Sequence, residues 1–349
     1  MAAKTADRSI EMVPVEEAVG TVLAHDITEI RPGQFKGPAF KKGHIIKEED
    51  LEHLLRLGKE HLYVLRLGQG EYHEDDAARM LASALCGENV GPSGPPSEGK
   101  IALVAQTKGL LKVNVGALTE FNMVPDVSCS SRHNNVVVKE GDAVAATRAI
   151  PLVISERNLM EAVAIADQAG GIFAVKRFSK LKAGGVVTGN EVFYGRIEDK
   201  FVPILRRKLS EFDCSLSQIK FCPDKRDVIR NAILDLVDSG AQLILVAGGM
   251  SVDPDDVSRR GIVDAGATDL VYGSPVLPGA MFLYARVKGV PLMGLPACVL
   301  YFKATVFDLM LPRVLAGEVI RRRDLAEMAH GGMCLNCKTC HYPVCPFGK

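Results

Sequence analysis

Residues 242–257 read Gln242-Leu243-Ile244-Leu245-Val246-Ala247-Gly248-Gly249-Met250-Ser251-Val252-Asp253-Pro254-Asp255-Asp256-Val257. The aliphatic run at the start is typical of a buried parallel strand, and the paired glycines mark the end of that strand. In an open α/β sheet, ligands bind beyond the carboxyl ends of the strands, where glycines let the backbone approach and helix N-termini offer N–H groups to oxyanions. The segment therefore predicts a ligand-binding loop.

The acidic residues of this loop indicate the kind of ligand. Phosphate alone would favour a Lys or Arg, whereas Asp253, Asp255 and Asp256 suit a Mg²⁺ ion that bridges to a phosphate. The alternative is a tight turn from strand to helix in which one Asp is the N-cap. Two glycines, Ser251 and three carboxylates together favour the binding site.

Composition limits the classes of partner. Lys and Arg total 42, as do Asp and Glu, so no overall field attracts the chain to nucleic acid or to a membrane surface. The N-terminus lacks the apolar core of a signal peptide, and no run reaches the about 18 apolar residues that span a bilayer. We expect a cytoplasmic protein whose partners are small molecules or other proteins.

The sequence patterns predict four parts. They are a small α+β module at 9–75, a β-rich domain at 76–175 with a linker or surface loop at 91–97, an α/β domain at 176–316, and a Cys-rich tail at 317–349. The third part alternates strands with longer helices, which is typical of βαβ units in a doubly wound, mostly parallel sheet. Its predicted strands are 185–188, 243–247, 270–272, 282–287 and 291–295, and its predicted helices are 227–237 and 299–311, the latter ending before Pro312.

Three further loops leave predicted strands in the same way, at 186–192, 272–279 and 294–298. Each alone is an ordinary turn, since Gly and Pro punctuation is a weak signal. Because they follow successive strands of one sheet, we expect them to meet at one edge and form a single site.

The motifs in these loops are Thr188-Gly189-Asn190-Glu191, Gly248-Gly249-Met250-Ser251 with Asp255-Asp256-Val257, Tyr272-Gly273-Ser274-Pro275 and Gly294-Leu295-Pro296. This set resembles the molybdopterin-binding domain of molybdenum cofactor biosynthesis proteins, and most closely the molybdopterin molybdenumtransferase branch. The resemblance is specific over 181–316, diffuse over 9–175 and absent from the tail. It implies a domain that binds molybdopterin or adenylylated molybdopterin, uses Mg²⁺, inserts molybdate and forms a homodimer.

The resemblance also implies roles for individual residues. Asp256 and Glu191 are the expected catalytic groups, which would position a divalent cation or an attacking water. A carboxylate favoured by the helix dipole in the first turn is the alternative for Glu191. The residues expected to bind the cofactor are Thr188, Gly189, Asn190, Gly248, Gly249, Ser251, Asp255, Gly273, Ser274 and Pro296.

The chain departs from the pattern of the transferase branch at three places. Asn190 stands where the family often has Asp, and Ala297-Cys298 replaces the Gly-Asn of a Leu-Pro-Gly-Asn-Pro motif. The Ser-x-Met-Asp-Gly-Tyr-Ala segment of the other active-site face has no match. Two functions therefore stay open: an enzyme that inserts molybdenum with Mg²⁺-assisted release of AMP, and a non-catalytic module that carries the cofactor to a molybdoenzyme or another biosynthesis protein.

The tail has a cysteine pattern of its own. Cys334, Cys337, Cys340 and Cys345 form a C-x₂-C-x₂-C-x₄-C-P run that ends at Pro346. Closely spaced cysteines followed by Pro favour iron–sulfur ligation, zinc is the second interpretation, and a metal-free thiol tail is the third. The other five cysteines are scattered, which is typical of a reducing compartment.

Overall fold

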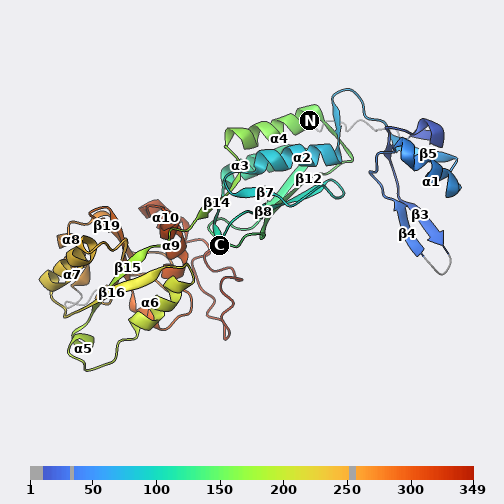
Figure 1. Cartoon of the computed structure of the whole chain (residues 1–349). Helices are drawn as coiled ribbons and strands as arrows, with labels where there is room; N and C mark the ends of the chain where they lie inside the picture. Colours follow the sequence, from blue (N-terminus) through green and yellow to red (C-terminus); the bar gives the residue numbers. More distant parts are fainter. Residues whose placement is uncertain (1–10, 32–34, 251–256) are drawn as a thin grey trace. The chain divides into compact units, whose positions relative to one another are not determined.

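A computed structural model of the chain describes residues 11–31, 35–250 and 257–349. The chain divides into two compact units, Met1–Val175 and Lys176–Lys349 (Figure 1). Within the described ranges, no helix combines the length and the apolar character needed to cross a bilayer.

The first unit begins with a small module built on a three-stranded antiparallel sheet of order β1-β5-β2 and a β3–β4 ribbon. A core of its own, which includes Leu23, Ile27, Leu54 and Leu62, holds the module together. Its elements are β1 (Glu11–Pro14), η1 (Val15–Glu17), β2 (Val22–Leu23), β3 (Ile27–Arg31), β4 (Phe35–Phe40), η2 (Glu48–Asp50), α1 (Leu51–Arg56) and β5 (His61–Leu65).

The rest of the first unit packs helices against antiparallel sheets, and α2 lies beside α4 (Figure 1). One hydrophobic core joins these elements, because Leu81, Leu103, Phe121 and Phe173 belong to the same buried cluster. The elements are β6 (Glu71–His73), α2 (Glu74–Leu85), β7 (Val90–Pro92), β8 (Lys100–Ala105), β9 (Gly109–Val113), α3 (Val115–Met123), β10 (Val127–Ser131), β11 (Val137–Val138), β12 (Ala143–Ala149), β13 (Val153–Ser155), α4 (Glu156–Gln168) and β14 (Phe173–Arg177).

The segment 91–97 fits the surface-loop alternative of the prediction rather than the linker, because it lies inside the first unit. β7 pairs with β8 as the edge strand of the sheet β10-β12-β8-β7, and the N–H of Ser93 donates to the carbonyl of Ala102 at 2.8 Å. Pro is tolerated on an edge strand, where its missing N–H need not join a ladder. The Gly/Pro/Ser run is therefore the end of an edge strand plus an exposed turn inside one domain.

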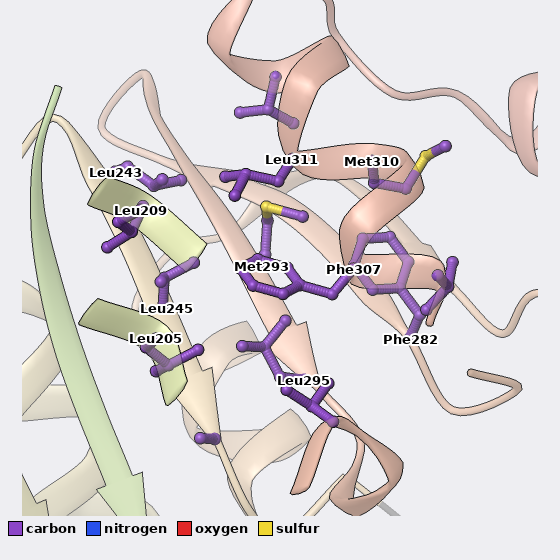
Figure 2. Close-up of a cluster of buried hydrophobic side chains, with 14 of the residues drawn as sticks. Leu205, Leu209, Leu243, Leu245, Phe282, Met293, Leu295, Phe307, Met310 and Leu311 are labelled. Carbon is purple, nitrogen blue, oxygen red and sulfur yellow. The ribbon is translucent and has the colours of Figure 1, made fainter. Parts of the chain in front are cut away.

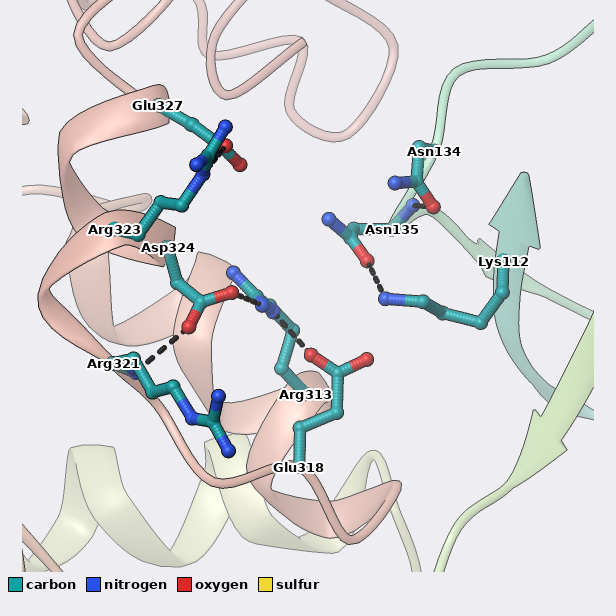
Figure 3. A network of polar contacts seen from close by, with 9 residues as sticks. All are labelled: Lys112, Asn134, Asn135, Arg313, Glu318, Arg321, Arg323, Asp324 and Glu327. Atoms are coloured by element: carbon teal, nitrogen blue, oxygen red, sulfur yellow. Dashed lines mark hydrogen bonds and ion pairs between the residues drawn. The ribbon is translucent and has the colours of Figure 1, made fainter. Parts of the chain in front are cut away.

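The polar contacts of the loop at Asn134 and Asn135 fix it to β9. Lys112 Nζ donates to Asn135 Oδ1 at 2.6 Å, and the N–H of Val113 donates to Asn134 Oδ1 at 3.0 Å. Figure 3 shows the Lys112 side chain reaching this loop.

The second unit is built on a six-stranded sheet of order β16-β15-β17-β20-β19-β18. β16, β15, β17 and β20 run parallel, and β19 runs antiparallel to both of its neighbours. The elements are β15 (Lys182–Thr188), α5 (Asn190–Phe193), α6 (Phe201–Ser210), β16 (Ser215–Cys222), α7 (Arg226–Asp238), β17 (Leu243–Ala247), α8 (Ser258–Asp264), β18 (Thr268–Tyr272), β19 (Leu283–Val287), β20 (Val290–Leu295), η3 (Ala297–Leu300), α9 (Val306–Leu315) and α10 (Arg322–Glu327).

Helices cover both faces of this sheet. Alternate side chains of a strand point to opposite faces, and those of β17 are buried on both. On one face, Leu243 and Leu245 of β17 pack in a cluster with residues of α6 and α9 (Figure 2). On the other face, Ile244 and Val246 pack in a cluster with residues of α7 and α8. The predicted α/β class with a doubly wound, mostly parallel sheet is confirmed.

The predicted helix at 299–311 is wrong in its bounds. A short η3 precedes α9, which begins after the N-cap Thr305 and continues through Pro312 to Leu315. Pro lacks the N–H that would bond to the carbonyl four residues earlier, which belongs to Asp308. The hydroxyl of Tyr342 donates to the Asp308 carbonyl at 3.3 Å, so a tail residue supplies the hydrogen bond that Pro312 cannot make.

The segment that follows α9 packs on the same core, since Ile320, Leu325 and Phe347 belong to it. Arg313 bonds to the carboxylates of Glu318 and Asp324 and so links α9 to α10 (Figure 3). Burial disfavours the charge on Arg313, but the two carboxylates outweigh burial and raise the pKa of the guanidinium.

Candidate functional site

The strand register brings the predicted loops to one edge of the sheet. Thr188 at the end of β15 is aligned with Cys222 of β16, and Ala247 at the end of β17 is aligned with Leu295 of β20. Tyr272 at the end of β18 reaches the same edge through its pairing with the start of β19. The chain segments that follow these strand ends therefore leave the sheet at its carboxyl edge.

Two glycines allow β15, β17 and α8 to meet closely at this edge. Gly248 and Gly249 have φ of +94° and +59°, values that L-residues with side chains rarely adopt. A Cβ on Gly248 would lie 2.5 Å from the carbonyl oxygen of Thr188, and a Cβ on Gly249 would lie 2.4 Å from Ser258 Oγ. The loop therefore requires glycine at both positions.

The hydroxyl of Thr188 has partners within the protein. Thr188 Oγ1 lies 3.0 Å from Ser258 Oγ, and it also donates to the carbonyl of Ala247 at 3.4 Å. Both hydroxyl side chains are buried. The Thr188 hydroxyl therefore links the end of β15 to the end of β17 and to the start of α8. Ser258 is a residue of the site that the sequence patterns did not indicate.

Asn190 is held by a reciprocal pair of bonds with Asp224. The N–H of Asn190 donates to Asp224 Oδ2 at 2.9 Å, and the N–H of Asp224 donates to Asn190 Oδ1 at 3.2 Å. Asp224 follows β16 and was missed from the sequence, although a carboxylate just after a strand was a usable signal. Glu191 is exposed in the first turn of α5.

The loop after β18 uses its own backbone groups internally. The N–H of Gly273 donates to the carbonyl of Phe282 and that of Ser274 donates to Ala280, each at 2.9 Å. Ser274 Oγ accepts the N–H of Val276 at 3.2 Å. These two predicted binding residues therefore shape the loop, and their N–H groups already have acceptors.

Two arginines add positive charge at this edge and were not predicted. The guanidinium of Arg259 lies 4.6 Å from the centre of the Tyr272 ring, and Arg322 Nη1 donates to the carbonyl of Gly273 at 2.8 Å. Tyr272 in turn donates its hydroxyl to the carbonyl of Met250 at 2.8 Å, which ties two loops together. Arginines so placed suit a ligand that carries phosphate.

The loop after β20 completes the edge. Pro296 is buried and is the N-cap of η3, whereas Ala297 is exposed. Cys298 is half-buried, and burial raises the pKa of its thiol above the ordinary value. Of the predicted site residues, Ser251, Asp255 and Asp256 lie outside the described residues, as does Asp253.

The structure gives no assembled metal site in the parts of the chain that it describes. In the described ranges, no three His, Cys, Asp or Glu side chains are grouped closely enough to hold a metal ion. The predicted ligands Cys334, Cys337, Cys340 and Cys345 are included in this statement, and each is a free thiol. The described side chains therefore do not form a ready-made iron–sulfur or zinc site. The Mg²⁺ prediction rests on Asp253, Asp255 and Asp256, which lie outside the described residues.

Comparison with known families gives a match in each unit. Residues 184–316 match the family described as "Probable molybdopterin binding domain", and residues 12–66 match a family described as a domain of unknown function. The first match spans the described strand ends and loops of the sheet edge. The second unit is therefore similar to this family over residues 184–316, while the transferase branch is not confirmed.

The CinA-like relatives match only a part of the chain. The CinA-like protein of Mycolicibacterium gilvum is 39% identical over 77 residues, which is 22% of this chain and 18% of the relative. The CinA-like protein of Mycobacterium avium is 33% identical over 95 residues, 27% of this chain and 22% of the relative. The chain thus spans less than a quarter of the length of these relatives.

Several solved structures of low sequence identity are similar to part of the chain. CinA from Thermoplasma acidophilum has a TM-score of 0.35 at 17% identity and covers 39% of this chain and 99% of its own. The molybdopterin biosynthesis enzyme MoaB from Thermus thermophilus has a TM-score of 0.34 at 17% identity, covering 40% of this chain and 98% of its own.

Proposed function

We propose that the second unit binds molybdopterin, or its adenylylated form, at the carboxyl edge of its sheet, and that the chain serves molybdenum cofactor biosynthesis. The observation that carries this proposal is the convergence of the loops after β15, β17, β18 and β20 within the matched range 184–316. Ligands of open α/β sheets bind at such an edge.

The chemistry of the edge suits a phosphorylated ligand. Gly248 and Gly249 have no side chains, so a phosphate oxygen can approach the backbone there. Arg259 and Arg322 supply positive charge at the same edge, held by contacts with Tyr272 and Gly273. A guanidinium that is already positioned loses less side-chain entropy when it binds an anion.

The first candidate activity is that of a molybdopterin molybdenumtransferase. Water would cleave the phosphoanhydride of adenylylated molybdopterin to give AMP and molybdopterin, and molybdate would supply the metal. Glu191, exposed at the edge, and Asp256 would orient the water or hold Mg²⁺. When bound, Mg²⁺ would offset the negative charge of the phosphates.

The second candidate is a carrier that binds the cofactor without turnover. It is favoured by two departures from the transferase pattern. Asn190 offers no charge and is engaged with Asp224. Cys298 presents a half-buried thiol, a weak hydrogen-bonding group, where the branch usually has Asn. A carrier would pass the cofactor to a molybdoenzyme.

One experiment separates the two candidates. Purified protein is incubated with adenylylated molybdopterin, Mg²⁺ and molybdate, and AMP release is followed. The transferase predicts turnover that Asp256→Asn or Glu191→Gln abolishes while pterin binding survives. Asp238→Asn is the matched control, because Asp238 ends α7 just before β17 begins at Leu243, at the opposite edge of the sheet from these loops, and pairs with Lys288. Pterin binding without AMP release would reject the transferase and keep the carrier.

The family resemblance also leads us to expect a homodimer. Light scattering of the purified chain checks this expectation, with twice the mass of 37.6 kDa as the expected result. A monomer at micromolar concentration would contradict it without bearing on ligand binding.

A further inference from the structure

The tail forms a folded loop on the second unit that is fixed at both ends. At its start, the N–H of Cys334 donates to the carbonyl of Leu277 at 2.8 Å. At its end, Phe347 is 2% exposed within the core, and the N–H of Gly348 donates to the carbonyl of Gly331 at 2.9 Å. Tyr342 packs against Phe347 in between, with ring centres 6.3 Å apart.

A cavity of about 200 Å³ lies under this loop. Every thiol of the tail lines it: Cys334, Cys337, Cys340 and Cys345. His341 lines it as well, and so do two cations, Lys303 and Lys338. The tail therefore brings four soft ligands to the wall of one space, which its spacing alone did not ensure.

We propose that these four cysteines bind a thiophilic metal centre, either a single Zn²⁺ ion or an iron–sulfur cluster. The four cysteines are not among the residues assigned to the cofactor site, and this proposal does not rest on the proposed function. The C-x₂-C-x₂-C-x₄-C-P spacing and the shared cavity are independent observations that agree.

The ligands must move together when the metal binds. Zn–S bonds of about 2.3 Å place the sulfurs of a tetrahedral site about 3.8 Å apart, and the described side chains are not grouped so closely. The segment can adapt because turns and bends, rather than a helix or strand ladder, make up residues 334–349. Binding is thus coupled to closure of the loop over the cavity, as in other small metal sites.

The charge of the cavity suits thiolates. Four cysteines that bind Zn²⁺ release four protons and leave a centre with two net negative charges, which Lys303 and Lys338 can offset. The scattered cysteines differ, since burial raises the pKa of Cys86 to about 11 and that of Cys129 to about 12. Those thiols stay protonated and are structural.

The test is the metal content of the full chain purified without oxygen, with Cys337→Ser and Cys340→Ser as ligand variants. Both cysteines are exposed, so their substitution leaves the core intact. Cys86→Ser is the matched thiol control. We expect about one metal centre per chain in the parent and the control, and a loss of tenfold or more in the ligand variants.

Spectra distinguish the two forms of the centre. Absorption near about 400 nm with bound iron identifies a cluster, whereas a colourless protein with zinc identifies the single ion. Metal removal should also speed hydrogen exchange at the tail amides but not in β17. A parent chain that holds no metal, and that takes up neither added Zn²⁺ nor iron with sulfide, would overturn the proposal. So would ligand variants that keep their metal.

Discussion

Replacing Gly248 by Ala should destabilise the second unit through two separate effects. The residue has a φ of +94°, which costs a side chain about 1–2 kcal/mol. The new Cβ would also lie 2.5 Å from the carbonyl oxygen of Thr188, a backbone atom that cannot rotate away. Overpacking of this kind costs about 1–3 kcal/mol, so we expect a total of about 2–5 kcal/mol.

Gly240→Ala is the matched control for the backbone effect. Gly240 has a similar φ of +86°, but nothing lies within 4 Å of the position of its Cβ. This variant should therefore lose only about 1–2 kcal/mol. The difference between the two variants isolates the close approach of the loop after β17 to β15.

Native-state hydrogen exchange of the β15 and β17 amides measures this difference within the second unit alone. A gap of about 1–3 kcal/mol corresponds to exchange about 5 to 150 times faster in Gly248→Ala than in Gly240→Ala. Equal rates in the two variants would refute the close contact between Gly248 and Thr188.

Three further predictions concern other contacts. Tyr342→Phe should destabilise the second unit by about 1 kcal/mol, as measured by urea denaturation. The loss should be smaller in a Pro312→Ala background, because the alanine N–H could bond to the Asp308 carbonyl instead; equal losses in both backgrounds would contradict this. Burial raises the pKa of the Glu74 carboxyl above 4.5, so the folded first unit binds the carboxyl proton more tightly than the unfolded chain does. The stability of this unit should therefore fall as pH rises from about 4.5. Glu74→Gln should reduce the dependence of stability on pH in denaturation between about pH 4 and 7, and an unchanged dependence would refute the role of Glu74. Asn190→Ala should speed exchange of the Asp224 amide severalfold, whereas Asn190→Asp, which keeps the acceptor oxygen, should not.

The strongly apolar strands of the second unit were readable from sequence. The run 243–247 and the helical pattern at 227–237 became β17 and α7, because each is buried and its period is clear. The order of strands and loops then indicated that several loops meet at one edge. Sequence patterns predict such strands because a strand buried on both faces of a sheet needs a continuous apolar run.

Other features depend on contacts that are remote in sequence. β16 is an edge strand with exposed side chains at Ser217 and Phe221, so it lacks the apolar run of a central strand. The strand was therefore not predicted, and Asp224, which follows it in the chain, was missed. Ser258 enters the site only because α8 packs under Gly249. Pro312 looked like a helix end because the partner of the Asp308 carbonyl comes from Tyr342, 34 residues later.

The binding of molybdopterin at the carboxyl edge is tested most directly by hydrogen exchange of the full chain with and without saturating molybdopterin. We predict slower exchange in the loops that hold Gly248, Gly249 and Ala297, and no change at the opposite edge, where β17 begins at Leu243 and β20 begins at Val290. Protection confined to the opposite edge, or none at either edge, would contradict the proposed site.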